Sequence, residues 1–214
     1  MQFGDLTVAG PASPKFLKAV AVLSEHLHPA FNEEAWLKPD VSKISCILSS
    51  LAVRDFLWKI GYKDAQVRTV LFEVRAYKDG KEIHSLGIGE DYSGNRHYRD
   101  PNKWTGHMIA YVPSEKFIID TTLYQAQRDA WKMLPPMFAT VEVRGVKGFG
   151  LESIAALRHT DENYQLNLYW FDQPENKKWR GAPDTAKDRR VNVVRKLVER
   201  FGSWKDTETD ISLV

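Results

Sequence analysis

The sequence contains one cysteine, Cys46, and its position gives its thiol a chemistry that it would lack elsewhere. Cys46 lies near the start of an apolar run from Ile44 to Ile60, whose hydrophobic residues cover nearly the whole circumference of a helix. We therefore expect a buried central helix that is capped by Ser42 and carries Cys46 in its first turn. Unpaired N–H groups and the positive end of the helix dipole favour a thiolate in the first turn. The alternative is that Cys46 is only a small hydrophobic residue of the core, because free cysteines are usually buried.

A predicted hairpin places a histidine and an aspartate on one face of a sheet. Strands 107–112 and 117–121 flank a proline-containing loop, which puts the last residue of 107–112 opposite the first residue of 117–121. In that register, His107 and Asp120 are diagonal neighbours within reach of each other. An aspartate bonded to one ring nitrogen leaves the other nitrogen free to accept a proton from a thiol. Each residue taken alone also has a purely structural interpretation: His107 as a polar residue at the start of a strand, and Asp120 as a residue that caps the end of a strand.

Four segments carry these residues: Ser45-Cys46-Ile47-Leu48-Ser49-Ser50-Leu51, Ile60-Gly61-Tyr62, Trp104-Thr105-Gly106-His107-Met108-Ile109-Ala110 and Phe117-Ile118-Ile119-Asp120-Thr121-Thr122-Leu123-Tyr124-Gln125. Together they resemble the transglutaminase-like branch of the papain-like cysteine peptidase and acyltransferase superfamily, over about residues 42–127. The resemblance implies a papain-like core with a Cys-His-Asp triad: Cys46 as nucleophile, His107 as base and then acid, and Asp120 as the residue that orients His107. It implies acyl transfer or amide hydrolysis through a thioester on a peptide, protein or other amide, without metal or cofactor.

Such a reaction also needs donors for an oxyanion, and the sequence offers only weak candidates. Gln2 is too remote from Cys46 to serve as the upstream glutamine of papain-like proteases. Trp36 resembles in position the upstream tryptophan of transglutaminases, and the backbone N–H of Cys46 is a second candidate. Trp104 and Gln125 flank the predicted strands and are expected to line the cleft, although Gln125 is equally typical of a surface turn. Removing one oxyanion donor typically costs about 10²–10³ in turnover.

The composition is that of a globular protein. Of the 214 residues, 43% are hydrophobic and 27% charged, which excludes a disordered or coiled-coil chain and favours a single domain over 1–214. In this interpretation residues 128–214 form an extension, unassigned by the resemblance, that packs on the core. A single cysteine excludes an internal disulfide framework and a Cys-rich metal site.

Hydrophobic periodicity predicts helices followed by a mostly antiparallel sheet, an α+β fold in which the buried central helix packs on the sheet. The expected helices span 14–28, 44–60 and 187–201, and the expected strands lie at 69–77, 82–87, 107–112, 117–121, 140–144 and 167–171. The segment 89–103 lacks periodicity and is predicted to be a long loop that selects substrate or closes over the site.

A second interpretation is a catalytically retired fold that binds a protein or a nucleic acid. The terminal helix carries a basic face near Lys177-Lys178-Trp179-Arg180, and this face suits an acidic partner or, equally, plain solvation. A nucleic-acid partner is disfavoured because the whole chain has a net charge of only +2. A metal site is disfavoured because His26, His28, His84, His97, Asp91 and Asp100 show no ligand-type spacing.

The chain shows no membrane or secretory signal at the level of its sequence. It lacks an apolar run of about 18 residues, and its N-terminus lacks the basic and apolar regions of a signal peptide. We therefore expect a cytoplasmic protein without a membrane partner, with export by a dedicated system left open.

Overall fold

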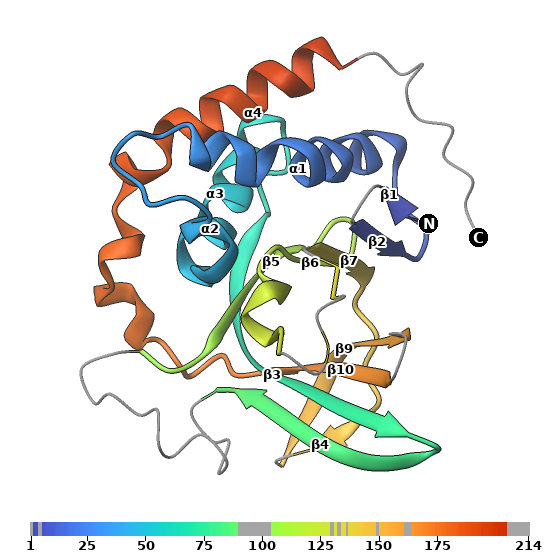
Figure 1. Ribbon diagram of the computed structural model, residues 1–214. Coiled ribbons are helices and arrows are strands. Elements are labelled where there is room, and N and C mark those ends of the chain that lie inside the picture. The colour runs from blue at the N-terminus through green and yellow to red at the C-terminus, as the bar shows by residue number, and fades with distance from the viewer. Residues whose placement is uncertain are drawn as a thin grey trace.

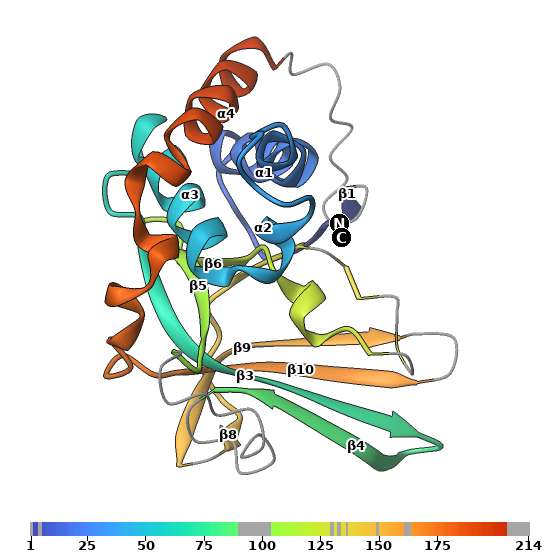
Figure 2. The same ribbon diagram turned by 60° about the vertical axis from the view of Figure 1, so that its left-hand side comes forward.

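A layer of helices lies on one side of a curled β-sheet (Figures 1 and 2). This computed structural model describes residues 2–3, 6–89, 104–128, 131, 134–135, 137–148, 150–160 and 164–204. The described α-helices are α1 (Pro14–Asn32), α2 (Val41–Ile44), α3 (Cys46–Lys59) and α4 (Val191–Ser203). Short 3-10 helices are η2 (Leu123–Ala126), η3 (Lys178–Gly181), η4 (Pro183–Thr185) and η5 (Lys187–Arg189). The predicted α+β class is confirmed.

Ten described strands form the sheet, and most neighbours run antiparallel. The strands are β1 (Gln2–Phe3), β2 (Leu6–Ala9), β3 (Gln66–Lys78), β4 (Lys81–Ile88), β5 (His107–Val112), β6 (Phe117–Asp120), β7 (Met137–Val141), β8 (Lys147–Gly148), β9 (Leu151–Thr160) and β10 (Gln165–Asp172). Their order is β1-β2-β7-β6-β5-β3-β10-β9-β8, with β4 paired to β3 and with β2 and β7 parallel. The long strand β3 therefore joins the hairpin β5–β6 to the C-terminal strands.

The register of the β5–β6 hairpin follows the prediction. Val112 pairs with Phe117, and the pairing continues to Ala110 opposite Ile119. Because side chains alternate between the faces of a sheet, this register places His107 and Asp120 on one face. An additional residue in the loop would have moved Asp120 to the other face.

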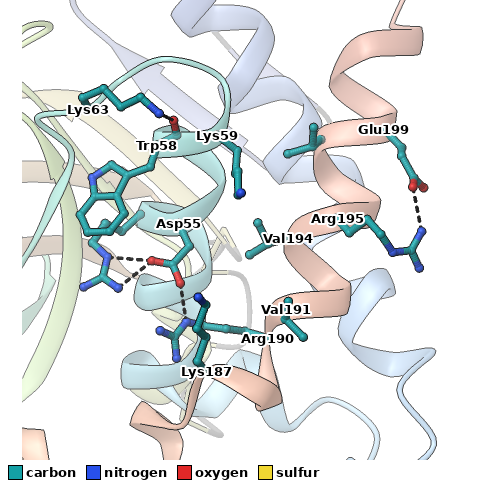
Figure 3. A pocket seen from close by; sticks show the side chains of 12 residues that line it. Asp55, Trp58, Lys59, Lys63, Lys187, Arg190, Val191, Val194, Arg195 and Glu199 are labelled. Atoms are coloured by element: carbon teal, nitrogen blue, oxygen red, sulfur yellow. Dashed lines mark hydrogen bonds and ion pairs between the residues drawn. The ribbon is translucent and has the colours of Figure 1, made fainter.

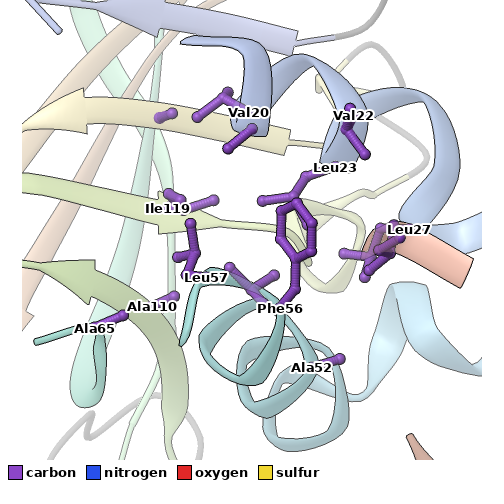
Figure 4. Packing of buried hydrophobic residues seen from close by; sticks show 14 of the residues in the cluster. Val20, Val22, Leu23, Leu27, Ala52, Phe56, Leu57, Ala65, Ala110 and Ile119 are labelled. Carbon is purple, nitrogen blue, oxygen red and sulfur yellow. The ribbon is translucent and has the colours of Figure 1, made fainter. Parts of the chain in front are cut away.

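Helix α3 is buried against its neighbours, as its apolar circumference predicts. The Phe56 ring reaches from α3 toward Leu23 of α1, and Ile119 of β6 lies in the same cluster (Figure 4). These three side chains are almost fully inaccessible to solvent. The first turn of α3 is thereby held at a fixed place relative to β5 and β6.

The structure corrects several predicted boundaries. Helix α1 continues past Pro29 to Asn32, because one missing donor leaves the later bonds intact, including that from the Glu33 N–H to the Pro29 carbonyl at 3.2 Å. Ser42 does not cap the central helix: it lies within α2, and Ser45 caps α3. The helix predicted from residue 187 begins at Val191, after η5.

The sequence prediction misses one strand and misplaces another. Strand β9 was missed, and the strand predicted at 140–144 is β7, which lies earlier. Of the predicted loop 89–103, residues 90–103 lie outside the described residues, and so do Asp91, His97 and Asp100. No helix in the described part of the chain is both long and apolar enough to cross a bilayer.

Candidate active site

The side chains of His107 and Asp120 form a hydrogen-bonded pair that is fully buried. The His107 Nε2–H donates to Asp120 Oδ2 at 2.6 Å, and the Trp170 indole N–H donates to the same oxygen at 2.8 Å. The Thr122 backbone N–H donates to the other carboxylate oxygen at 2.9 Å. A buried carboxylate with donors on both oxygens is held in its ionised form and in one orientation.

The pair shifts both pKa values toward the charged forms. Burial alone would raise the pKa of Asp120, but the charge and hydrogen bond of His107 outweigh burial and lower this pKa below 3.8. Burial alone would lower the pKa of His107, but the charge and hydrogen bond of Asp120, assisted by Cys46, raise this pKa above 6.5. The structure thus favours an imidazolium against a carboxylate at neutral pH.

The second ring nitrogen of His107 faces Gln125. Gln125 donates from Nε2 to the Ile44 carbonyl at 2.5 Å, so its amide oxygen must face His107 Nδ1, 3.2 Å away. Both ring nitrogens therefore act as donors, in agreement with an imidazolium. Cys46 is a further neighbour of His107, and its side chain contributes to the raised pKa of that histidine.

Cys46 is the first residue of α3. The Ser45 hydroxyl caps the helix by accepting the Leu48 N–H at 3.4 Å and donates to Asp184 at 2.5 Å. The backbone N–H groups of Cys46 and Ile47 lie in the first turn, where a helix supplies no acceptor of its own. The sulfur therefore sits beside backbone donors.

Cys46 lines a pocket of about 630 Å³, although the residue itself is only 6% exposed. Trp104 and Gln125 line the same pocket, so these two predicted cleft residues are brought to the cysteine. The opposite wall comes from the chain after β10 and contains Lys178, Gly181, Ala182, Pro183 and Asp184. The segment that the resemblance leaves unassigned thus completes this pocket.

Trp104 is fixed at the start of β5 by a small network. Its indole N–H donates to Asn176 Oδ1 at 2.6 Å, and Asn176 Nδ2 donates to the Thr105 carbonyl at 3.0 Å. A Cβ atom on Gly106 would stand 2.4 Å from the Trp104 ring. Glycine is therefore required where the indole crosses the chain next to His107.

Of the side chains predicted as oxyanion donors or cleft residues, Trp104 and Gln125 reach the pocket of Cys46, whereas Trp36 does not line it. Trp36 is not among the residues lining the pocket: it is 49% exposed, and its indole N–H donates to Glu34 at 3.3 Å, so the structure contradicts this assignment. The connection after α1 leads the indole onto the surface instead. Trp104 and Gln125 reach the pocket, but their N–H groups bond to Asn176 and to a backbone carbonyl. The Cys46 backbone N–H is the best-placed remaining candidate.

Two aromatic residues that support the pair were not anticipated from the sequence. Trp170 lies on β10, and its indole also packs against Phe72, at 5.0 Å between ring centroids. Phe72 in turn stacks on the His107 ring at 5.1 Å. The alternating pattern of 167–171 indicated a strand, but a pattern does not tell which distant strand it joins.

The described residues contain no group of three His, Cys, Asp or Glu side chains placed to hold a metal ion. His28 is instead a buried residue whose Nδ1 lies 3.0 Å from the Ser42 hydroxyl. Burial lowers the pKa of His28 to about 4, so its ring is neutral at physiological pH. Its contacts tie α1 to α2, just ahead of Cys46.

Comparison with protein families, with curated proteins and with solved structures finds no match to this chain.

Proposed function

We propose that the protein catalyses cysteine-dependent acyl transfer or amide hydrolysis, with Cys46 as nucleophile. The observation that carries the proposal is the position of His107, which donates to buried Asp120 through Nε2, faces Gln125 with Nδ1, and has Cys46 as a neighbour that raises its pKa. A thiol, an imidazole and a carboxylate in this order are the parts of a Cys-His-Asp triad. The transglutaminase-like, papain-like architecture belongs to the same proposal.

The reaction has two steps. The Cys46 sulfur forms a bond to the amide carbonyl carbon, and as the C–N bond breaks the leaving amine takes a proton from His107 Nδ1. Water or a second amine then gives a proton to His107 and attacks the thioester, which releases the acyl product and restores the thiolate. The Cys46 backbone N–H would stabilise the oxyanion in both steps.

The alternative function is an interaction module that has kept the fold without the chemistry. It is favoured by one observation, the low exposure of Cys46 combined with a Gln125 amide seated on His107 Nδ1. In an enzyme this amide must yield to the substrate, whereas in a module it can stay in place.

Alkylation of the only thiol distinguishes an activated cysteine from an ordinary one. We expect wild-type protein to react with iodoacetamide at pH 6.5 at least about ten-fold faster than the His107→Ala variant, because the imidazolium stabilises the thiolate. His84→Ala, which removes an exposed histidine on β4, should match the wild type. Equal rates in all three proteins, rising only near the ordinary thiol value of about 8.5, would contradict the proposal.

Acyl transfer itself is tested with p-nitrophenyl acetate, an activated acyl donor. We expect a burst of nitrophenolate and an acetyl group on Cys46 in the intact-mass spectrum, both lost in Cys46→Ser and strongly reduced in Asp120→Asn. Rapid alkylation without any acetyl-enzyme would instead support the interaction module.

A further inference from the structure

A second pocket, of about 810 Å³, lies between α3 and α4 (Figure 3). Its lining contains the basic residues Arg54, Lys59, Lys63, Lys187, Arg190 and Arg195 and the acidic residues Asp55 and Glu199. The net charge of this lining is +4, from six cations and two carboxylates, whereas the whole chain carries +2. The rest of the chain therefore carries a net charge of −2.

Part of this charge is already neutralised inside the pocket. Asp55 accepts from Arg54 at 2.6 Å and from Arg190 at 2.7 Å, and Arg195 pairs with Glu199 at 2.7 Å. Both carboxylates of the lining are thus engaged.

Two cations of the lining are free. The ammonium groups of Lys59 and Lys187 have no partner among the residues that the structure describes. They approach the pocket from different elements, α3 and η5. A ligand with two separated negative charges can therefore pair with both without displacing an existing partner.

The floor between these cations is apolar. Val191, Val194 and Val198 follow one another on α4 at the spacing of one helix face, and Figure 3 shows Val194 and Lys59 projecting into the same space. Val191 is 49% exposed, and Trp58 on the opposite wall is 39% exposed. An apolar stripe edged by cations suits an amphipathic segment that carries carboxylates beside its apolar residues.

We propose that this groove binds an acidic amphipathic segment of another polypeptide. Its carboxylates pair with Lys59 and Lys187, and its apolar side chains pack on the α4 valines and on Trp58. Charge complementarity selects the partner, because an anionic ligand is attracted to a patch that holds more positive charge than the whole chain.

Two features favour a polypeptide over a nucleic acid. The Arg54 guanidinium covers one face of the Trp58 ring, 4.5 Å from its centroid, and the indole N–H donates to the Ala65 carbonyl. At most one face of this ring remains open, whereas single-stranded nucleic acids stack successive bases on several aromatic rings. Outside the groove the net charge of the chain is −2, from +2 for the whole chain and +4 for the lining, so the rest of the protein adds no net attraction for successive phosphates.

The proposed groove is separate from the pocket of Cys46, and binding there does not depend on catalysis. Trp58 follows Cys46 by twelve positions on α3, which corresponds to about 18 Å along the helix axis. Binding can therefore be measured in the Cys46→Ala variant, where the chemistry of the thiol is absent.

The test is fluorescence anisotropy with a labelled helical peptide of about 14 residues that carries glutamates beside a leucine stripe. In Cys46→Ala protein at low salt we expect saturable binding that weakens as salt is added. Adding Lys59→Glu and Lys187→Glu should weaken binding at least about ten-fold. The matched control adds Lys78→Glu and Lys81→Glu, the same charge change on the exposed β3–β4 turn, and should bind like the parent.

Two comparison probes complete the experiment. The same peptide with glutamine in place of glutamate should bind more weakly, and an oligothymidylate should not compete with the acidic peptide. The proposal is overturned by equal losses in the two charge-reversal variants, by the absence of saturable binding, or by oligothymidylate that binds more tightly and depends on the same lysines.

Discussion

Trp170 and His107 donate to the same oxygen of Asp120, at 2.8 Å and 2.6 Å. The two donors come from strands that are 63 positions apart in the sequence and that both border β3. The carboxylate is therefore held by donors from two different strands, and its orientation depends on the C-terminal strands as much as on the hairpin.

Trp170→Phe removes one of these donors and keeps an aromatic ring. We expect a loss of about 1–3 kcal/mol in the free energy of unfolding, because a buried carboxylate loses a hydrogen bond, and a slower alkylation of Cys46. Urea denaturation and iodoacetamide kinetics measure the two effects. Trp131→Phe is the control, since Trp131 is also buried but donates to the Ala126 carbonyl. If both variants slow alkylation equally, Trp170 has no special link to the proposed triad.

The His107–Asp120 pair also predicts a pH dependence of stability. The raised pKa of His107 stabilises the fold fully below 6.5, and this contribution is lost as pH rises through the folded-state pKa. The lowered pKa of Asp120 stabilises the fold above 3.8, and this contribution is lost as pH falls through the folded-state pKa. The pair therefore contributes most between pH 3.8 and 6.5.

The measurement is the difference in unfolding free energy between wild type and His107→Gln across pH. It should be largest in that window and shrink toward alkaline pH. His84→Gln, at an exposed position, should give no such window. A difference that grows with pH above 6.5 would contradict the assigned imidazolium.

Ser45→Ala removes the cap of α3 and the hydroxyl that contacts Asp184. A lost N-cap costs about 1 kcal/mol and lets the first turn fray, so the Cys46 thiolate should lose its backbone donors and react a few-fold more slowly. Ser203→Ala, at the exposed end of α4, is the control and should change neither stability nor alkylation. Unchanged alkylation in Ser45→Ala would show that the helix start does not activate the thiol.

Gly106→Ala tests the packing of Trp104. The new methyl group would overlap the indole and displace it, so we expect a loss of about 1–3 kcal/mol in stability and a shifted tryptophan emission. At Gly145 a Cβ meets nothing within 4 Å, so Gly145→Ala should leave both unchanged. A Gly106→Ala protein with wild-type stability and emission would refute this role.

Local patterns in the sequence were sufficient to place Cys46 at the start of a helix and to bring His107 and Asp120 to one face of a hairpin. The loop length between β5 and β6 determined which residues face the same side, and the apolar run after Ser45 located the helix that carries Cys46. Both inferences depend on neighbours in sequence. The capping residue was misassigned because Ser42 and Ser45 are equally suitable types, and only Ser45 has the geometry to receive the Leu48 N–H.

Long-range contacts were beyond what the sequence could predict. Trp170, Asn176 and Asp184 reach the site because β10 pairs with β3 and the chain then turns back along α3. No local pattern encodes that pairing. Trp36 is the converse case, a residue that the sequence predicted for the site and that lies elsewhere. It has a suitable type and lies at a suitable distance upstream of Cys46, but its side chain is on the surface.

The dependence of Asp120 on Trp170 has a consequence for synthesis. A ribosome releases Cys46 and the hairpin well before it translates β10, so the nascent chain carries the thiol without the indole that clamps its acid. Fragments that end before β10 lack this clamp as well. The order of translation thereby delays the hydrogen bond between Trp170 and Asp120, and with it the complete arrangement of the proposed triad, until β10 has been made.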